Sequence, residues 1–334
     1  MHRLPNNPGP RPEKPRSLTA VILRAVYWVG VAVGGSLFLY QIWVGALSLG
    51  EHSFNRSLPI NLVIAWASAA LAYWLQISAW SLIMGELSVR LPWRRAMRGY
   101  TLSFLPRYIP GSIWGYLSRG QWLLDSFGVP YSLTNGGAIL EMTVAITSCV
   151  LIIIAFSAEG MLQVVPAFVT GLLPILVWLI VRRVLGWPWV QQRLRTGTVQ
   201  APMKTISLPL WITVIAMHTI AWILYGNTLL HILWGFGFET GANLPRAVFM
   251  FSASWLIGFL VPFVPAGLGF RETTLSALLI ATVGLVPGQA SAISVASRLF
   301  VALAELTLVL GGLALGGSHG SGVRPSFQGG HNPN

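Results

Sequence analysis

The chain has 334 residues, of which 54% are hydrophobic and only 9% are charged. Such a composition offers too few polar side chains to cover a water-soluble surface, so it excludes a soluble globular fold and predicts an all-α, polytopic integral membrane protein of the cell membrane. The formal net charge of +12 does not indicate a nucleic-acid partner, because the cations form short clusters beside hydrophobic segments, the pattern of the positive-inside rule.

Two polar tails flank the hydrophobic part of the chain. Residues 1–17 are basic and rich in proline and predict a disordered cytoplasmic tail, and residues 317–334 predict a second disordered tail. Residues 18–316 between them are expected to form one transmembrane domain. Apolar segments of roughly 20 residues, the length that crosses a bilayer, predict about six spanning helices, near residues 20–47, 60–85, 131–157, 161–181, 207–235 and 288–315.

Proline and glycine break the chain in two further stretches, residues 93–128 and 245–284. The first contains FLPRYIPGSIWG and the second contains FLVPFVPAGLGFRE. A helix in lipid satisfies its own backbone, so an opened backbone at membrane depth must be satisfied by protein or water, and such openings line the ligand sites of transporters. We therefore predict two helical hairpins, each of which returns to the side from which it enters.

The two breaks share positions that recur 156 residues later: Pro106 and Pro262, Gly111 and Gly267, and Gly128 and Gly284. Coincidence is the alternative explanation, because the chain contains 35 glycines and 21 prolines. If both termini are cytoplasmic, the basic loops at residues 90–98 and 182–204 also face the cytoplasm. The two hairpins then enter from opposite sides, which predicts an inverted-topology repeat of the kind that secondary transporters use.

Charged residues on the helices after the hairpins predict a central polar cavity. Glu141 and Arg298 each lie 11 residues beyond a proline that begins a helix, so both sit about 16 Å into a core roughly 30 Å thick. Arg298 and Glu305 share a face with Ser291 and Ser294, whereas Glu141 is the only charge on a face of small residues. The alternative is a buried ion pair that locks two helices. Each central charge, however, costs about 2.5–3.5 kcal/mol, and small residues alone can hold helices together.

For several other polar residues the sequence leaves two roles open. Arg271 and Glu272 follow the glycines of the second break, and because neighbouring side chains on a helix point in different directions, one of them is expected to be structural. Arg107 and Arg119 flank the first break, where binding a lipid phosphate and snorkelling to the interface are equally reasonable. The face that carries His218, Trp222 and Tyr225 predicts packing, and no metal-binding or catalytic spacing accompanies it.

RYIPGSIWG, followed by Arg119, Gly128 and Glu141, together with VPAGLGFRE, resembles the flippase-like transmembrane family named after the membrane part of bacterial lysylphosphatidylglycerol synthase. The resemblance covers most of residues 20–315 and implies a translocase that moves a phospholipid headgroup. Ala266 departs from the family pattern, which often has glycine there. The soluble aminoacyl-transferase domain has no counterpart, so neither lipid synthesis nor a lysyl headgroup is implied.

The expected function is therefore a membrane lipid translocase that passes a phospholipid or glycolipid headgroup through the cavity. Its partner would be an anionic or zwitterionic phospholipid or a polyprenyl-linked glycolipid, with a homo-oligomer or a biosynthetic enzyme as a further partner. Arg298, with Arg107 or Arg271, would hold a phosphate, and Glu141 and Glu305 would hold a cationic group or balance the arginines. The substrate-binding candidates are Arg107, Pro110, Gly111, Arg119, Glu141, Gly267, Gly269, Arg271, Glu272, Arg298 and Glu305.

Two functions of other classes are the alternatives. The first is a membrane scaffold that does not transport and that organises enzymes of envelope lipid or glycan biosynthesis. The second is a lipid-modifying transferase, which the absence of a nucleophile and base set in the sequence disfavours. No nucleotide-binding motif is present, and neither a cofactor nor a metal is expected.

Overall fold

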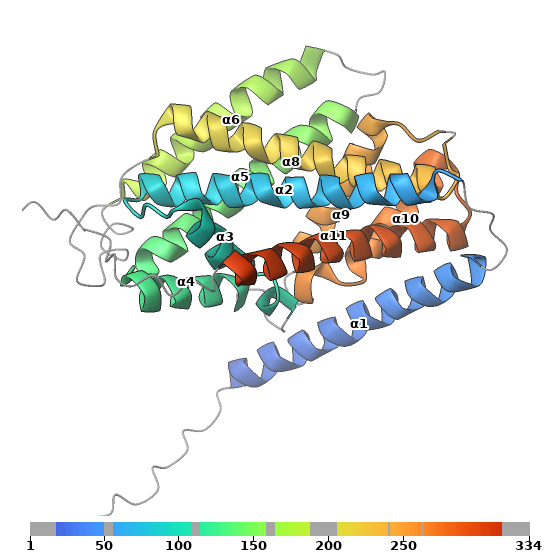
Figure 1. The fold of residues 1–334 in the computed structure, drawn as a ribbon, viewed down its shortest axis with the longest axis horizontal. Coiled ribbons are helices and arrows are strands. Elements are labelled where there is room, and N and C mark those ends of the chain that lie inside the picture. The colour runs from blue at the N-terminus through green and yellow to red at the C-terminus, as the bar shows by residue number, and fades with distance from the viewer. Residues whose placement is uncertain are drawn as a thin grey trace, which may run out of the picture.

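The computed structural model describes residues 18–49, 56–108, 114–157, 164–187, 206–239, 241–261 and 264–315. Within these ranges all regular structure is helical, which confirms the predicted all-α class (Figure 1). Among the described residues, five helices are long and apolar enough to cross a membrane. They are α1 (Leu18–Leu49), α2 (Leu58–Glu86), α5 (Tyr131–Ser157), α8 (Leu208–Gly235) and α11 (Pro287–Leu315).

The remaining predicted span, near residues 161–181, corresponds to α6 (Val164–Leu185), a helix of 22 residues whose last turn contains Arg182 and Arg183. It is not among the five helices that meet the length and composition expected of a span. Its crossing of the membrane therefore stays a prediction.

The first predicted hairpin consists of two short helices around a break. α3 (Trp93–Thr101) has 9 residues, α4 (Trp114–Phe127) has 14 residues, and the 3₁₀ turn η1 (Pro106–Tyr108) lies between them. At 1.5 Å per residue the two helices are about 14 Å and 21 Å long, less than the roughly 30 Å of a hydrocarbon core. Neither arm can cross a bilayer by itself.

The second hairpin is built in the same way. α9 (Leu244–Phe259) has 16 residues and begins at Asn243, whose side chain accepts a hydrogen bond from the Arg246 backbone N–H at 2.9 Å. The 3₁₀ turn η2 (Pro265–Gly267) separates it from α10 (Phe270–Val283), which has 14 residues. These arms are about 24 Å and 21 Å long, again too short to span.

The offset of 156 residues recurs in the boundaries of the helices. α4 and α10 begin at residues 114 and 270 and end at residues 127 and 283, and α5 and α11 begin at residues 131 and 287. Gly128 and Gly284 directly follow α4 and α10, and both have left-handed backbone angles, with φ of +66° and +79°. Glycine suits this conformation because it has no Cβ to clash. Gly128 and Gly284, one of the pairs that suggested the offset, therefore occupy equivalent structural positions.

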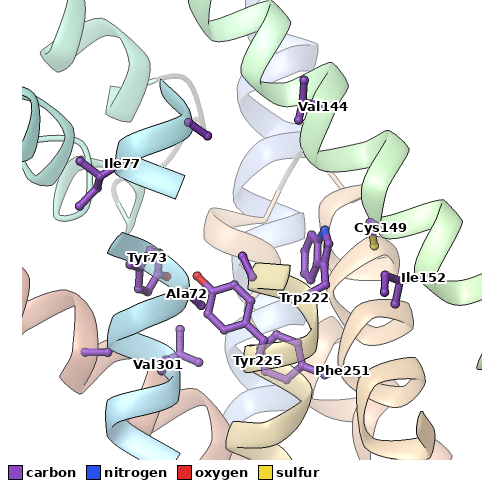
Figure 2. Close-up of a cluster of buried hydrophobic side chains, with 14 of the residues drawn as sticks. Ala72, Tyr73, Ile77, Val144, Cys149, Ile152, Trp222, Tyr225, Phe251 and Val301 are labelled. Carbon is purple, nitrogen blue, oxygen red and sulfur yellow. The ribbon is translucent and has the colours of Figure 1, made fainter. Parts of the chain in front are cut away.

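The centre of the bundle is formed by α2 and α8, which pack along their lengths, with α5, α9 and α11 around them. Figure 2 shows aromatic rings from three of these helices gathered in the core, with Tyr73 and Tyr225 turning their hydroxyl groups toward one another beside Phe251. α1 lies at the edge of the bundle, where it packs on α10 and α11 (Figure 1). The middle of the core therefore contains the hydroxyl groups of buried tyrosines.

The first and last described helices place both chain ends on one side. The N-terminal end of α1 and the C-terminal end of α11 lie at the same end of the bundle as α3 and α4 (Figure 1). The exposed arginines Arg90 and Arg94 lie at the junction of α2 and α3, and Arg182 and Arg183 are exposed at the end of α6. This end of the molecule is therefore strongly basic.

Candidate functional site

A cavity of about 420 Å³ lies between the two breaks. The turns η1 and η2 lie next to each other at its edge. Gly115 and Arg271, which are the second residues of α4 and α10, both line it. The N-termini of both short helices therefore open onto the same space, and the partial positive charge of a helix N-terminus favours a bound anion.

The most deeply buried arginine of the cavity is held in an ion pair. Arg119 is 2% exposed, and its Nη2 donates to Oε2 of Glu141 at 2.7 Å. Its guanidinium lies over the rings of Trp80 and Tyr100, at 4.8 Å and 4.9 Å from their centroids. The pair links α4 to α5, so the carboxylate of Glu141 is already neutralised.

Glu305 fixes the first break from α11. Its Oε1 accepts from Nη1 of Arg107 at 3.0 Å and from the Tyr73 hydroxyl, and its Oε2 accepts from the Tyr108 hydroxyl at 2.8 Å. Arg107 also lies over the Phe104 ring, 4.6 Å from its centroid. Two residues of η1 are thus tied to one buried carboxylate.

Arg298 fixes the second break from the same helix. Its Nη1 donates to the Ala266 carbonyl at 3.2 Å, and its Nε lies 3.7 Å from Oε1 of Glu272. Oε2 of Glu272 accepts the Gly269 backbone N–H at 2.6 Å, which caps the start of α10. Arg298 and Glu305 are two turns apart on one face of α11, so this helix holds both breaks.

Ala266 adopts a left-handed conformation, with φ of 49° and ψ of 26°. This conformation costs an alanine about 1–2 kcal/mol. The hydrogen bond from Arg298 to its carbonyl helps to hold the strained turn. The second break therefore keeps a tight turn with alanine at this position.

Arg271 differs from the other arginines of the cavity. It is 8% exposed, and no carboxylate of the described residues lies within ion-pair distance of it. Its guanidinium lies 4.5 Å from the centroid of the Phe251 ring, and its Nη2 has no hydrogen-bond partner in the described part of the chain. Nη2 of Arg298 is also buried without a partner. Two guanidinium donors at the cavity are therefore available to a ligand.

The structure brings most of the predicted site residues together. Those that line the cavity are Arg107, Arg119, Glu141, Gly267, Arg271, Arg298 and Glu305. Glu272 lies behind the wall and is the structural member of its pair with Arg271, as the sequence predicted for one of the two. Gly269 packs against α1, and Pro110 and Gly111 lie outside the described residues.

The observed ion pairs differ from a direct pair between Glu141 and Arg298, which the sequence allowed. Glu141 and Arg298 lie at matching depths in their helices, but Glu141 pairs with Arg119 and Arg298 pairs with Glu272. A direct lock between α5 and α11 through these two residues is therefore wrong. The pairing follows from how the two breaks fold back. This folding brings Arg119 next to Glu141 and Glu272 next to Arg298, whereas the equal depth of Glu141 and Arg298 in their helices suggested that these two would meet.

Sequence reasoning missed the aromatic part of the wall. Tyr73, Tyr100 and Tyr108 line the cavity. The face of α8 that the sequence predicted to pack is buried and also lines the cavity, through His218, Trp222 and Tyr225. Two of the tyrosines donate to Glu305, which the sequence could not indicate because the partners lie 232 and 197 residues apart. Tyr73 is the only one of these three tyrosines on a long apolar helix, where its polar atom is a signal that the sequence offers.

No protein-family model and no curated protein sequence matches this chain. The residues of the cavity and their geometry are therefore the basis for assigning a function.

Proposed function

We propose that this protein is a membrane lipid translocase that holds the anionic headgroup of a lipid in the cavity between its two breaks. The observation that carries the proposal is the pair of buried guanidinium groups, Arg271 and Arg298, each with an Nη2 that has no hydrogen-bond partner among the described residues. A buried arginine without partners is costly, and phosphate oxygens are well suited to satisfy it. The N-termini of α4 and α10 add to the same positive field.

The carboxylates balance the remaining arginines in this mechanism. Glu141 neutralises Arg119, and Glu305 neutralises Arg107 while accepting from two tyrosine hydroxyls. Of the two roles expected from the sequence, the balancing role is the one that these contacts favour. The phosphate would bind Arg271 and Arg298 and leave the acyl chains in the bilayer.

The two halves of the chain would act as an inverted repeat. Each half contains a long helix, a short helix, a break, a short helix of 14 residues and a second long helix, in that order. The constant offset of 156 residues supports this, as does the opposite direction of α2 and α8 in Figure 1. Rocking of one half against the other would expose the cavity to each side in turn.

The charge at the two ends supports an orientation in the cell membrane. The basic end, with Arg90, Arg94, Arg182 and Arg183, would face the cytoplasm together with both termini. This arrangement and the resemblance to the membrane part of lysylphosphatidylglycerol synthase point to the same class of protein. A flippase-like membrane domain fits both observations.

A scaffold that does not transport is the second candidate. The three ion pairs of Arg107, Arg119 and Arg298 would suit it, because they lock helices together. It gives no reason, however, for Arg271, a buried arginine beside the cavity that pairs with no carboxylate of the described residues. The binding partner of such a scaffold would be an enzyme or a second copy of the chain.

Translocation in proteoliposomes tests the proposal directly. Purified protein is reconstituted, and the transfer of an acyl-labelled anionic phospholipid between leaflets is followed by quenching the label in the outer leaflet. We expect faster transfer than in protein-free liposomes, loss of most of it in Arg298→Gln, and an unchanged rate in Arg94→Gln, which removes an exposed cation far from the cavity. A wild-type rate equal to that of protein-free liposomes would reject the translocase.

A further inference from the structure

The charges around the cavity do not cancel. Three of its four arginines are paired with a carboxylate: Arg107 with Glu305 at 3.0 Å, Arg119 with Glu141 at 2.7 Å, and Arg298 with Glu272 at 3.7 Å. Arg271 has no such partner among the described residues. The parts of the two breaks that lie outside those residues, 109–113 and 262–263, contain no ionisable side chain in the sequence. The wall therefore carries one positive charge more than it neutralises.

The excess charge is located where a ligand can reach it. Arg271 lines the cavity, and its Nη2 and that of Arg298 are buried guanidinium atoms without a hydrogen-bond partner among the described residues. One anionic group that accepts from both would satisfy both donors and cancel the excess charge. A second anionic charge would have no remaining cation to meet.

We infer that the headgroup bound in this cavity carries one net negative charge, as a phosphodiester whose remaining part is uncharged. This inference rests on the proposed function and narrows its substrate to a class. A phosphodiester has one ionisable oxygen, which matches the single uncompensated arginine. A phosphomonoester carries about −1.5 to −2 charges at pH 7 and would leave the cavity negative.

A zwitterionic headgroup fits the same wall poorly. Its ammonium group needs a carboxylate, but Glu141 and Glu305 are each paired with an arginine. Glu272 is 1% exposed and lies behind the wall, so a ligand does not reach it. The ammonium would therefore be buried without a counterion while Arg271 stays neutralised by the phosphate.

The size of the cavity limits the uncharged part. About 420 Å³ is near the lower end of the roughly 300–1,000 Å³ typical of ligand pockets. This volume accommodates one phosphate with a small polyol or a single sugar and excludes a long oligosaccharide. Two lipid types share this chemistry, namely a glycerophospholipid with a polyol headgroup and a polyprenyl phosphate that carries one sugar.

Lipid binding to the purified full-length chain tests the inference without any transport measurement. Native mass spectrometry in a non-ionic detergent would compare phosphatidylglycerol, phosphatidylethanolamine, phosphatidic acid and a polyprenyl phosphohexose. We expect the phosphodiester monoanions to bind at least about ten-fold more tightly than the zwitterion, because the ammonium of the zwitterion would be buried without a counterion. Whichever of the two monoanions binds more tightly identifies the lipid source.

Variants at Arg271 show whether the excess charge causes the preference. Arg271→Gln makes the wall neutral and should remove the preference for phosphatidylglycerol over phosphatidylethanolamine, whereas Arg271→Lys keeps the charge and should retain most of it. Arg94→Gln removes one exposed cation outside the cavity and should bind like the wild type. Each variant is compared at equal folded fraction by thermal unfolding, and if Arg271→Gln fails to fold, the wild-type series and Arg271→Lys decide.

The outcomes separate this inference from the translocase itself. Wild-type protein that binds the zwitterion or the phosphomonoester as tightly as phosphatidylglycerol overturns the inference even if it translocates lipid. An unchanged preference in folded Arg271→Gln does the same. The expected selectivity without any translocation in liposomes would instead support the binding class and reject the translocase.

Discussion

The two central carboxylates act on different parts of the fold. Glu141 holds Arg119 in a wholly buried pair between neighbouring helices, whereas Glu305 gathers an arginine and two tyrosines from elements far apart in the sequence. Removing one member of a buried pair is more damaging than removing both, because the charge left behind loses its compensation. This asymmetry makes the pairing testable residue by residue.

We predict that Glu141→Gln lowers the free energy of unfolding by about 3–5 kcal/mol, because it leaves Arg119 charged and buried. Combining it with Arg119→Gln should recover much of this loss, whereas combining it with Arg298→Gln should give additive losses because Arg298 pairs with Glu272 instead. Thermal or denaturant unfolding in detergent micelles measures both cycles. Asp125→Asn, at an exposed position, is the control for removing a carboxylate. Strong coupling between Glu141 and Arg298 would contradict the pairing described here.

At the scale of elements, α1 supports the second break through close backbone contact. The Gly34 carbonyl faces Gly269, Gly45 lies against Ala292, and Gly288 lies against Ser48. Small residues permit such close approach, which substitutes for a hydrophobic driving force between helices in lipid. α1 therefore acts as a brace for η2 and α10 from outside the cavity.

A comparison of alanine variants at Gly269 and Gly284 distinguishes the cost of backbone strain from the cost of losing this close contact. Both have positive φ, +81° and +79°, but a Cβ on Gly269 would overlap the Gly34 carbonyl oxygen, whereas a Cβ on Gly284 meets nothing within 4 Å. Gly284→Ala should therefore lose about 1–2 kcal/mol from the left-handed backbone alone. Gly269→Ala should lose clearly more and also lose translocation, as measured by unfolding and by the liposome assay. Equal losses in the two variants would show that α1 does not brace the break.

For the whole molecule, the distribution of basic residues predicts the direction of insertion. Glu239 is exposed next to the end of α8, and Arg94 and Arg183 are exposed at the opposite, basic end. With Cys149 replaced by alanine, Glu239→Cys should react with a membrane-impermeant maleimide in intact cells, and Arg94→Cys and Arg183→Cys should react only after permeabilisation. The parent without cysteine is the control for background. Labelling of Arg183→Cys in intact cells would reverse the proposed orientation and the entry sides of both hairpins.

The sequence alone determined the class of the protein, the place of both breaks, and the faces that carry Arg298, Glu305 and Glu141. These features depend on local composition and on helical periodicity, which a linear pattern records directly. The recurrence at 156 residues is also visible in the sequence, because Gly128 and Gly284 serve the same local need for a left-handed residue. Pro110 and Gly111 stay predictions, since they lie outside the described residues.

Only the tertiary structure decided which charges meet. Arg107 and Glu305 are 198 residues apart, and their contact depends on how η1 folds back toward α11. The same holds for the tyrosines on Glu305 and for Arg271, whose lack of a partner follows from Glu272 turning to the start of α10 and Arg298. Periodicity fixes the face on which a side chain lies, but its partner depends on the packing of distant helices. The charge that the cavity leaves for a ligand is therefore a property of the folded chain.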